Sequence, residues 1–381
     1  MAAGLFKKPF ASRLTDRPPI PSLDGLRAIS IAFVVFAHLS GTQFFPSFVI
    51  SGFLITTLLL EELAARGRIS LKRFYLRRAF RILPAKYFYL ALILLGVVAG
   101  LYHVDANDFL YAVTYTANYD YDRSWYMMHL WSLAVEEQFY LLWPAVLCCA
   151  GRKRAMWAAA GVMAVSPVLR TIALHWRPQA AWPIGASFQS NADALATGCL
   201  LAGTRAWLGG REWYRRFLDS RAFVLGPLAA LAACLAQPLA AFHETMGATL
   251  MNVAIALTID RCVRRPEDSA GRFLNQPAVA YAGVLSYSTY LWQQPFLNRL
   301  GTSAWNAFPV NLLFVAAASM ASYHLVEKPF LRMRRRIESR LFGSRPGPEK
   351  EAPVPVTASE AASLPRSSRP QSQPALPDPR I

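Results

Sequence analysis

An arginine and a histidine share one apolar stretch near the start of the chain. Between Arg27 and Gln43 the only side chain that titrates near neutral pH is His38. In a helix that rises about 1.5 Å per residue, their spacing separates the two side chains by roughly 16 Å along the axis, on nearly the same face. An imidazole at that depth in a bilayer is costly and by default marks a functional site, with packing against a neighbouring helix as the alternative.

Two carboxylates, Glu136 and Glu137, lie in a later apolar stretch. If the first stretch runs outward through a membrane and this one runs inward, Glu136 and His38 lie at a similar depth. A carboxylate beside an imidazole fixes its tautomer and raises its basicity, which a general base requires. The pattern therefore predicts a base made of His38 and Glu136, whereas Glu137 is expected to reach water.

The composition favours a membrane protein. Hydrophobic residues make up 54% of the chain and charged residues 17%, compared with about 25% charged in soluble domains. The net charge of +17 sits in short segments between apolar runs, so binding to nucleic acid is not expected. The five cysteines lack the spacing of a metal site or a disulfide framework, and we expect no bound metal.

We predict an all-α, polytopic integral membrane protein with about ten transmembrane helices. Each predicted span has roughly the length that a hydrocarbon core of about 30 Å requires. Lys and Arg are abundant after the even-numbered spans and scarce after the odd-numbered ones, which places both termini in the cytoplasm. The predicted spans are 27–44, 47–63, 83–101, 130–150, 155–173, 186–204, 222–240, 245–261, 279–297 and 306–326.

The regions around these spans have different characters. Residues 1–21 are predicted to form a basic cytoplasmic arm, and residues 22–330 the transmembrane domain. Residues 331–381 are basic at first and then rich in Pro and Ser, which predicts a disordered cytoplasmic tail from about residue 337. The connection 102–129, rich in Asp and Tyr, forms either an aromatic belt at the interface or part of a sugar-binding vestibule.

Several further polar motifs interrupt the predicted spans. In chain order with the first stretch they read Ser22-Leu23-Asp24-Gly25-Leu26-Arg27, Val49-Ile50-Ser51-Gly52-Phe53-Leu54-Ile55-Thr56, Arg77-Arg78-Ala79-Phe80-Arg81-Ile82-Leu83-Pro84, Trp131-Ser132-Leu133-Ala134-Val135-Glu136-Glu137-Gln138-Phe139-Tyr140, Ala192-Asp193-Ala194-Leu195, Leu285-Ser286-Tyr287-Ser288-Thr289-Tyr290-Leu291-Trp292 and Val326-Glu327-Lys328-Pro329-Phe330. This ordered set resembles the membrane-bound acyltransferase family 3 over about residues 22–330. Members of that family O-acylate surface polysaccharides, lipopolysaccharide, peptidoglycan and some small molecules.

The resemblance implies roles for individual residues. His38 resembles the family's catalytic histidine, and Arg27 resembles its partner. Arg78 and Arg81 match an arginine pair where an acyl-CoA donor would dock, since guanidinium groups bind phosphate; ordinary positive-inside charge is the alternative. Polar residues that either line an acceptor cavity or form helix–helix hydrogen bonds are Asp24, Ser51, Asp193, Tyr287 and Ser288.

The predicted function is that of an O-acyltransferase in the bacterial inner membrane. The enzyme would move an acetyl-type group from cytoplasmic acetyl-CoA, or another acyl-CoA, to a hydroxyl of a carbohydrate or lipid-linked sugar, without a permanently bound cofactor. His38, oriented by Glu136, would remove the hydroxyl proton or briefly carry the acyl group. A transporter or exchanger with an intramembrane His/Glu proton relay and a catalytically inactive family member are the alternatives.

Three features depart from the family pattern. The connection Leu39–Ile50 is shorter than the family's glycine-rich stretch. Asn191 stands where the family often has Arg, and Gln293 stands where it has His. The short connection alters the geometry expected around His38 and is the basis of the inactive-member alternative.

Overall fold

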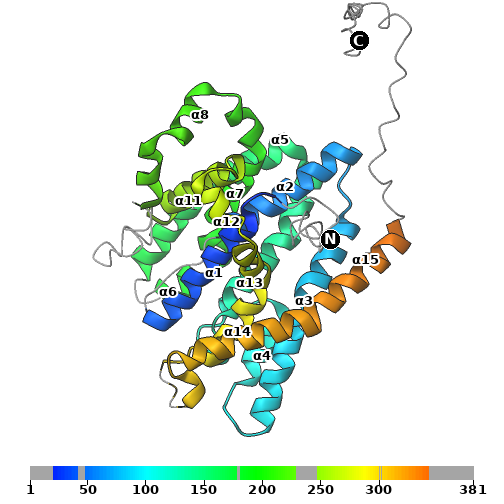
Figure 1. The fold of residues 1–381 in the computed structure, drawn as a ribbon, viewed down its shortest axis with the longest axis vertical. Coiled ribbons are helices and arrows are strands. Elements are labelled where there is room, and N and C mark those ends of the chain that lie inside the picture. The colour runs from blue at the N-terminus through cyan, green and yellow to red at the C-terminus, as the bar shows by residue number, and fades with distance from the viewer. Residues whose placement is uncertain are drawn as a thin grey trace, which may run out of the picture. The chain divides into compact units, whose positions relative to one another are not determined.

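The structure is a computed structural model that describes residues 20–41, 48–177, 181–228, 247–299, 301 and 303–342. All regular elements in these residues are helical (Figure 1). The α-helices are α1 (Leu23–Ser40), α2 (Val49–Arg66), α3 (Leu71–Val98), α4 (Ala106–Thr114), α5 (Leu130–Trp176), α6 (Ala181–Ala186), α7 (Phe188–Gly209), α8 (Glu212–Asp219), α11 (Ala248–Arg264), α12 (Ser269–Leu274), α13 (Pro277–Phe296), α14 (Val310–Ser322) and α15 (Lys328–Phe342). The short elements are the 3₁₀-helices η2 (Ala117–Tyr119), η3 (Trp125–Met127), η5 (Arg221–Val224) and η8 (Ala304–Asn306), and the π-helix η9 (Tyr323–Glu327).

Helices occupy the predicted spans, except that most of 222–240 lies outside the described residues. The spans 130–150 and 155–173 are joined in α5, where Gly151 interrupts the helix with φ 73° and ψ 165°. Among the described residues, four segments are long and apolar enough to cross a membrane: Leu23–Ser40, Leu71–Val98, Trp125–Trp176 and Val310–Phe342. The number of ten spans and their orientation stay predictions.

The interior helices are more polar than a lipid-facing helix. Helix α7 buries Ser190, Asp193 and Thr197, and α13 buries Ser286 and Ser288. Buried polar groups in membrane helices need partners on other helices rather than lipid around them. This explains why hydropathy alone does not select α7 and α13 as spans.

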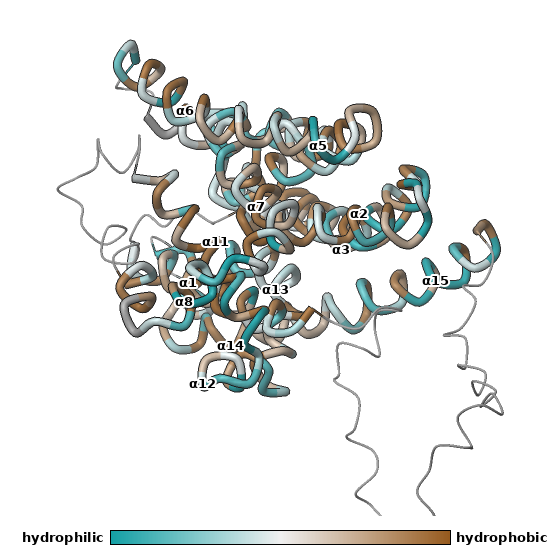
Figure 2. Tube along the Cα trace, turned by 90° about the horizontal axis from the view of Figure 1, so that it is seen from above, coloured by the Kyte–Doolittle hydropathy of each residue, from teal (hydrophilic) through white to brown (hydrophobic). Residues whose placement is uncertain are grey.

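The helices of the first unit, Met1–Glu338, form two groups. Helix α7 packs mainly against α5 and α2, whereas α13 packs mainly against α1 and α14. Figure 2 shows the same division, and α11 contacts members of both groups. The predicted site residues come from both groups and from α3.

Glycine lets α1 and α13 approach each other closely. A Cβ atom on Gly283 would overlap the backbone carbonyl of Asp24, and one on Gly25 would overlap the backbone of Leu274, which ends α12. A side chain at either position would therefore separate the backbones. Small residues at helix contacts serve this purpose in membrane proteins.

A second glycine pair joins α2 to α7. A Cβ atom on Gly52 would overlap the carbonyl of Leu195, and one on Gly198 would overlap the carbonyl of Val49. Gly52 follows Ser51 directly, so this contact fixes the position of the Ser51 hydroxyl within the bundle.

Helix α15 extends the described chain to Phe342, past residue 337, where the sequence predicted that disorder begins. The carboxylate of Glu338 accepts a hydrogen bond from Arg77 Nε at 2.9 Å and lies 3.4 Å from Arg73 Nε. These contacts tie α15 to α3, a long-range interaction that local composition does not reveal. Residues 1–19 and 343–381, predicted to be a basic arm and a disordered tail, lie outside the described residues.

Candidate functional site

His38 lies in the last turn of α1 and is half-buried. Its Nδ1 atom is 2.8 Å from the carbonyl oxygen of Val34, one turn earlier. Because a carbonyl only accepts hydrogen bonds, this contact places the proton of the neutral ring on Nδ1 and leaves a lone pair on Nε2. A neutral imidazole in that tautomer has Nε2 available as a proton acceptor.

Three residues that sequence analysis did not assign to the site surround this ring. Trp125 packs edge-on against His38, with the ring centroids 6.4 Å apart. The side chain of Gln294 approaches the ring, and His129 lies within electrostatic range of it. Trp125 also donates a hydrogen bond from Nε1 to the backbone oxygen of Gln294 at 2.7 Å. Connection 102–129 thus supplies a wall of the site, and its aromatic content was the available signal.

Glu136 has partners other than His38. The Ser51 hydroxyl donates a hydrogen bond to its Oε1 atom, and Arg27 and Arg78 are its electrostatic neighbours. Helix α5 begins after His129, so Glu136 lies about 10 Å further along the axis than the histidine near His38. The predicted orienting contact is therefore corrected: the Val34 carbonyl orients the His38 ring. A catalytic role for Glu136 stays a prediction.

The three predicted donor-binding arginines form what we call the arginine cluster, with Asp24, Glu136 and Glu327 as its carboxylates. An Arg27 Nη atom lies 3.7 Å from Asp24, and an Arg81 Nη atom lies 3.7 Å from Glu327. The Arg78 guanidinium stacks 4.2 Å above the centroid of the Tyr140 ring. The side chains of Arg27 and Arg81 remain 27% and 22% exposed, whereas that of Arg170 is 8% exposed.

Glu327 joins the arginine cluster through an irregular helix. It ends the π-helix η9 and is 1% exposed, and π-helical turns are frequent at functional sites. The Ser288 hydroxyl donates a hydrogen bond to its carboxylate, and the Tyr287 hydroxyl donates to the Ile82 carbonyl at 2.8 Å. These two predicted cavity residues therefore make helix–helix hydrogen bonds. The final sequence motif contained Glu327, but nothing local showed its partner.

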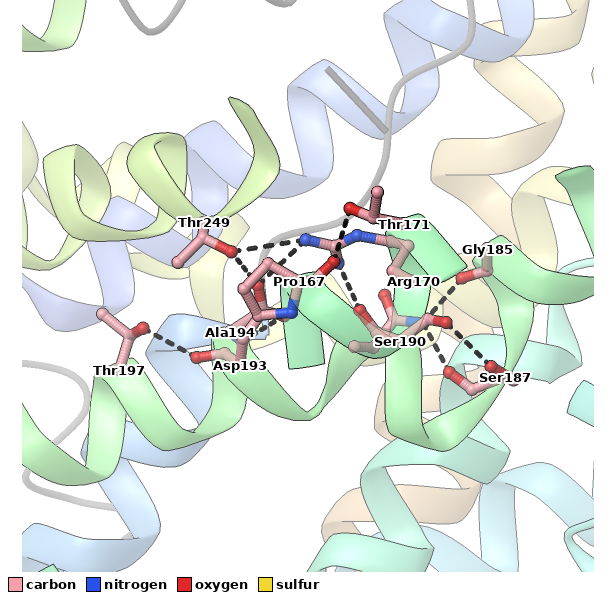
Figure 3. Close-up of polar contacts among 11 residues, drawn as sticks. Pro167, Arg170, Thr171, Gly185, Ser187, Ser190, Asp193, Ala194, Thr197 and Thr249 are labelled. Carbon is pink, nitrogen blue, oxygen red and sulfur yellow. Dashed lines mark hydrogen bonds and ion pairs between the residues drawn. The ribbon is translucent and has the colours of Figure 1, made fainter. Parts of the chain in front are cut away.

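Asp193 lies in a separate cluster, which Figure 3 shows. Arg170 of α5 approaches its Oδ2 atom at 3.2 Å, and the Thr249 hydroxyl of α11 donates to the same atom. Asn191, which stands where the family often has Arg, donates to the Gly185 carbonyl at 2.7 Å. The guanidinium beside Asp193 comes from Arg170, on another helix. The structure places Asp193 in this pair rather than beside His38.

The short connection between α1 and α2, including residues 42–47, lies largely outside the described residues. Within the described part of the chain, no group of three or more His, Cys, Asp or Glu side chains is arranged to hold a metal ion.

Comparison with known proteins identifies the family. The family described as "Acyltransferase domain" matches residues 20–323. The chain belongs to this acyltransferase family. The matched region contains α1 to α14 and all of the predicted site residues, and together with the apolar helices it supports a membrane protein.

Similar proteins include O-acetyltransferases, one of them named as putative. The chain is 27% identical over 356 residues to the "Putative peptidoglycan O-acetyltransferase YrhL" of Bacillus subtilis (strain 168), covering 81% of this chain and 54% of that protein. It is 26% identical over 352 residues to "O-acetyltransferase OatA" of Staphylococcus aureus (strain NCTC 8325 / PS 47), covering 81% of this chain and 57% of that protein. The chain thus spans about half the length of these curated relatives. No solved structure matches it.

Proposed function

We propose that this protein transfers an acyl group, most simply acetyl, from an acyl-CoA to a carbohydrate hydroxyl, with His38 as the general base. The contact between His38 Nδ1 and the Val34 carbonyl carries the proposal. It presents a neutral ring with the lone pair on Nε2 inside an apolar helix, as proton removal from an alcohol requires. Family membership supports acyl transfer, and the name of the Bacillus relative favours a glycan acceptor.

The arginine cluster is the proposed donor site. CoA carries phosphate groups, and guanidinium groups bind phosphate through paired hydrogen bonds. The cluster begins at Arg27, about 16 Å along α1 from His38. A phosphate bound there and a thioester at His38 would be joined by the extended pantetheine arm of CoA. In the predicted orientation the donor would enter from the cytoplasm.

The proposed reaction balances without a further reactant. The acceptor oxygen attacks the thioester carbonyl carbon while its proton passes to Nε2 of His38. The tetrahedral intermediate then collapses, the carbon–sulfur bond breaks, and the CoA thiolate takes the proton from the imidazolium. A thioester is already reactive toward a nucleophile. Positioning the two substrates and providing one general base are therefore the main contributions that the protein has to make to catalysis. Glu136 in this scheme balances Arg27 and Arg78 until the donor phosphates bind.

The test is turnover of radiolabelled acetyl-CoA by the purified full chain in lipid nanodiscs. The wild-type protein should bind acetyl-CoA and release or transfer the label, and His38→Ala should bind it without turnover. His324→Ala is the matched control, because that imidazole is exposed and contacts Tyr281 on another face. A well-folded wild-type protein that neither binds nor turns over acetyl-CoA would contradict the proposal.

A further inference from the structure

Two fully buried side chains beside His38 have polar atoms without a regular hydrogen bond. His129 is 3% exposed and Gln294 is 1% exposed. Neither ring nitrogen of His129 and neither amide atom of Gln294 makes a hydrogen bond of regular geometry, although the Gln294 amide approaches the His38 ring and the His129 ring approaches the Leu291 carbonyl. Most buried polar atoms in proteins are partnered, and an exception calls for a reason such as a bound molecule that completes the set.

The backbone adds an acceptor at the same place. Pro295 lies inside α13 and has no amide hydrogen, so the Leu291 carbonyl, four residues earlier, lacks its usual helical donor. The His129 ring approaches this carbonyl as a hydrogen-bond donor. The group formed by His129, Gln294 and the Leu291 carbonyl therefore offers both donors and acceptors, and all are uncharged when His129 is neutral.

The surrounding contacts hold this group in place. The Tyr290 hydroxyl donates to the His129 carbonyl at 2.7 Å and also pairs with the Ser132 hydroxyl. Trp125 fixes the backbone of Gln294 from the opposite element. Because the backbones of both residues are anchored, their side chains are held at fixed positions in the site.

We propose that His129, Gln294 and the Leu291 carbonyl form the acceptor subsite, which binds hydroxyl groups of an uncharged sugar and presents one of them to His38. The inference rests on the proposed function and names where its second substrate binds. A hydroxyl donates one hydrogen bond and accepts others, so it pairs with a mixed, neutral set. An anionic ligand would need donors and positive charge, which the arginine cluster offers instead.

The test separates the two substrates kinetically. The probes are acetyl-CoA and a β-1,4-linked trimer of N-acetylglucosamine, a small uncharged glycan. Gln294→Leu and His129→Phe keep much of the side-chain shape and remove the hydrogen-bonding atoms. Each should raise KM for the trimer about tenfold, while KM for acetyl-CoA stays within twofold, because the proposed phosphate contacts lie at the other end of α1.

A matched glutamine variant controls for damage to the fold. Gln138 is also an amide inside the bundle, but it donates to the Tyr115 carbonyl and to Asn118 Oδ1, both at 2.9 Å. Gln138→Leu should lower the thermal midpoint and leave KM for the trimer unchanged. Gln294→Leu should leave the midpoint unchanged or raise it, because it removes buried polar atoms that make no hydrogen bond of regular geometry.

The remaining outcomes overturn the inference. A fall in kcat at saturating trimer with KM unchanged would assign these residues to the chemical step, for example to stabilising the oxyanion. Unchanged kinetics in Gln294→Leu would exclude it from the subsite even if His129→Phe fails to fold. The wild-type protein could also consume acetyl-CoA at a rate that the trimer does not change and form no acetylated trimer. That result would refute a neutral sugar subsite. Failure of the wild-type protein to use acetyl-CoA at all would be the separate failure of the proposed function.

Discussion

The two ends of α1 satisfy their polar groups in opposite ways. At the Arg27 end, arginines of α1 and α3 face carboxylates, as Arg81 faces Glu327. At the His38 end the groups are neutral, and His129 and Gln294 make no hydrogen bonds of regular geometry. A desolvated charge is too costly to leave without a counter-charge, whereas an unpartnered neutral group costs less. We therefore expect a ligand at the Arg27 end to replace carboxylates as the partners of the arginines. A ligand at the His38 end should instead supply hydrogen bonds that the neutral groups lack.

The pair between Arg170 and Asp193 provides a reference for both ends. It is closed to solvent, with Arg170 8% and Asp193 1% exposed, compared with 27% for Arg27. The Arg27 side chain is therefore more exposed than that of Arg170, which is enclosed together with its partner.

The largest effect is expected at His38. His38→Gln keeps a polar side chain but removes the base, so kcat should fall about 10²- to 10⁴-fold. KM for acetyl-CoA should change less than twofold, because the proposed phosphate contacts lie at the other end of α1. Steady-state kinetics in nanodiscs measures both values. A large rise in KM for acetyl-CoA in His38→Gln would show that the His38 end and the Arg27 end of α1 do not act independently.

The reference pair should affect stability and leave kinetics intact. Asp193→Asn removes the charge opposite Arg170 and should lower the free energy of unfolding by about 1.5–3 kcal/mol, seen as a drop of several degrees in thermal unfolding. Asp219→Asn is the control, since its pair with Arg265 is exposed and should contribute less than about 1 kcal/mol. A loss of acceptor affinity in Asp193→Asn would return Asp193 to the sugar site.

The arginine cluster should respond to salt. Arg78→Met and Arg81→Met should each raise KM for acetyl-CoA about tenfold, as expected when one charged hydrogen bond is lost. The wild-type KM should also rise with ionic strength, and less steeply in these variants. Arg272→Met, at an exposed position, should behave like wild type. A salt response of the trimer KM would argue against a neutral subsite near His38.

The smallest effect has the opposite sign. Glu327→Gln removes the carboxylate that faces Arg81, so the guanidinium should attract the donor phosphate more strongly. KM for acetyl-CoA should fall about twofold, and the effect should disappear when Arg81→Met is also present, which a double-mutant cycle measures. An increase in KM would mean that Glu327 positions Arg81 rather than competing for it.

The sequence was informative where the signal is local. Apolar runs located the helices, and the ordered motifs pointed to the acyltransferase family that the comparison confirms. The partner of Asp193 was missed because Arg170 lies on another helix. The group around His38 was missed for the same reason, since Gln294 reaches the ring only through the packing of α13 on α1.

One part of the error was avoidable. Val34, the residue that orients His38, lies four positions earlier in the same helix, and such a carbonyl is available to any helical side chain that can reach back. Assigning the orienting role to Glu136 required equal depth for two side chains on different helices. The end of α1 changes that depth, because the helix stops at Ser40 rather than at 44 and so places His38 in its last turn. Element boundaries are the features that a sequence defines least sharply.

The close approach of α1 to α13 at Gly283, and to the end of α12 at Gly25, has a consequence for motion. Because the backbones leave no space for a side chain there, neither helix can slide or rotate past the other without a clash. We expect the two helices to move as one rigid body that carries His38 and Gln294 together. Any opening that admits a bulky substrate would then shift this pair against the group formed by α2, α5 and α7. The distance from base to acceptor would be preserved while the entrance changes width.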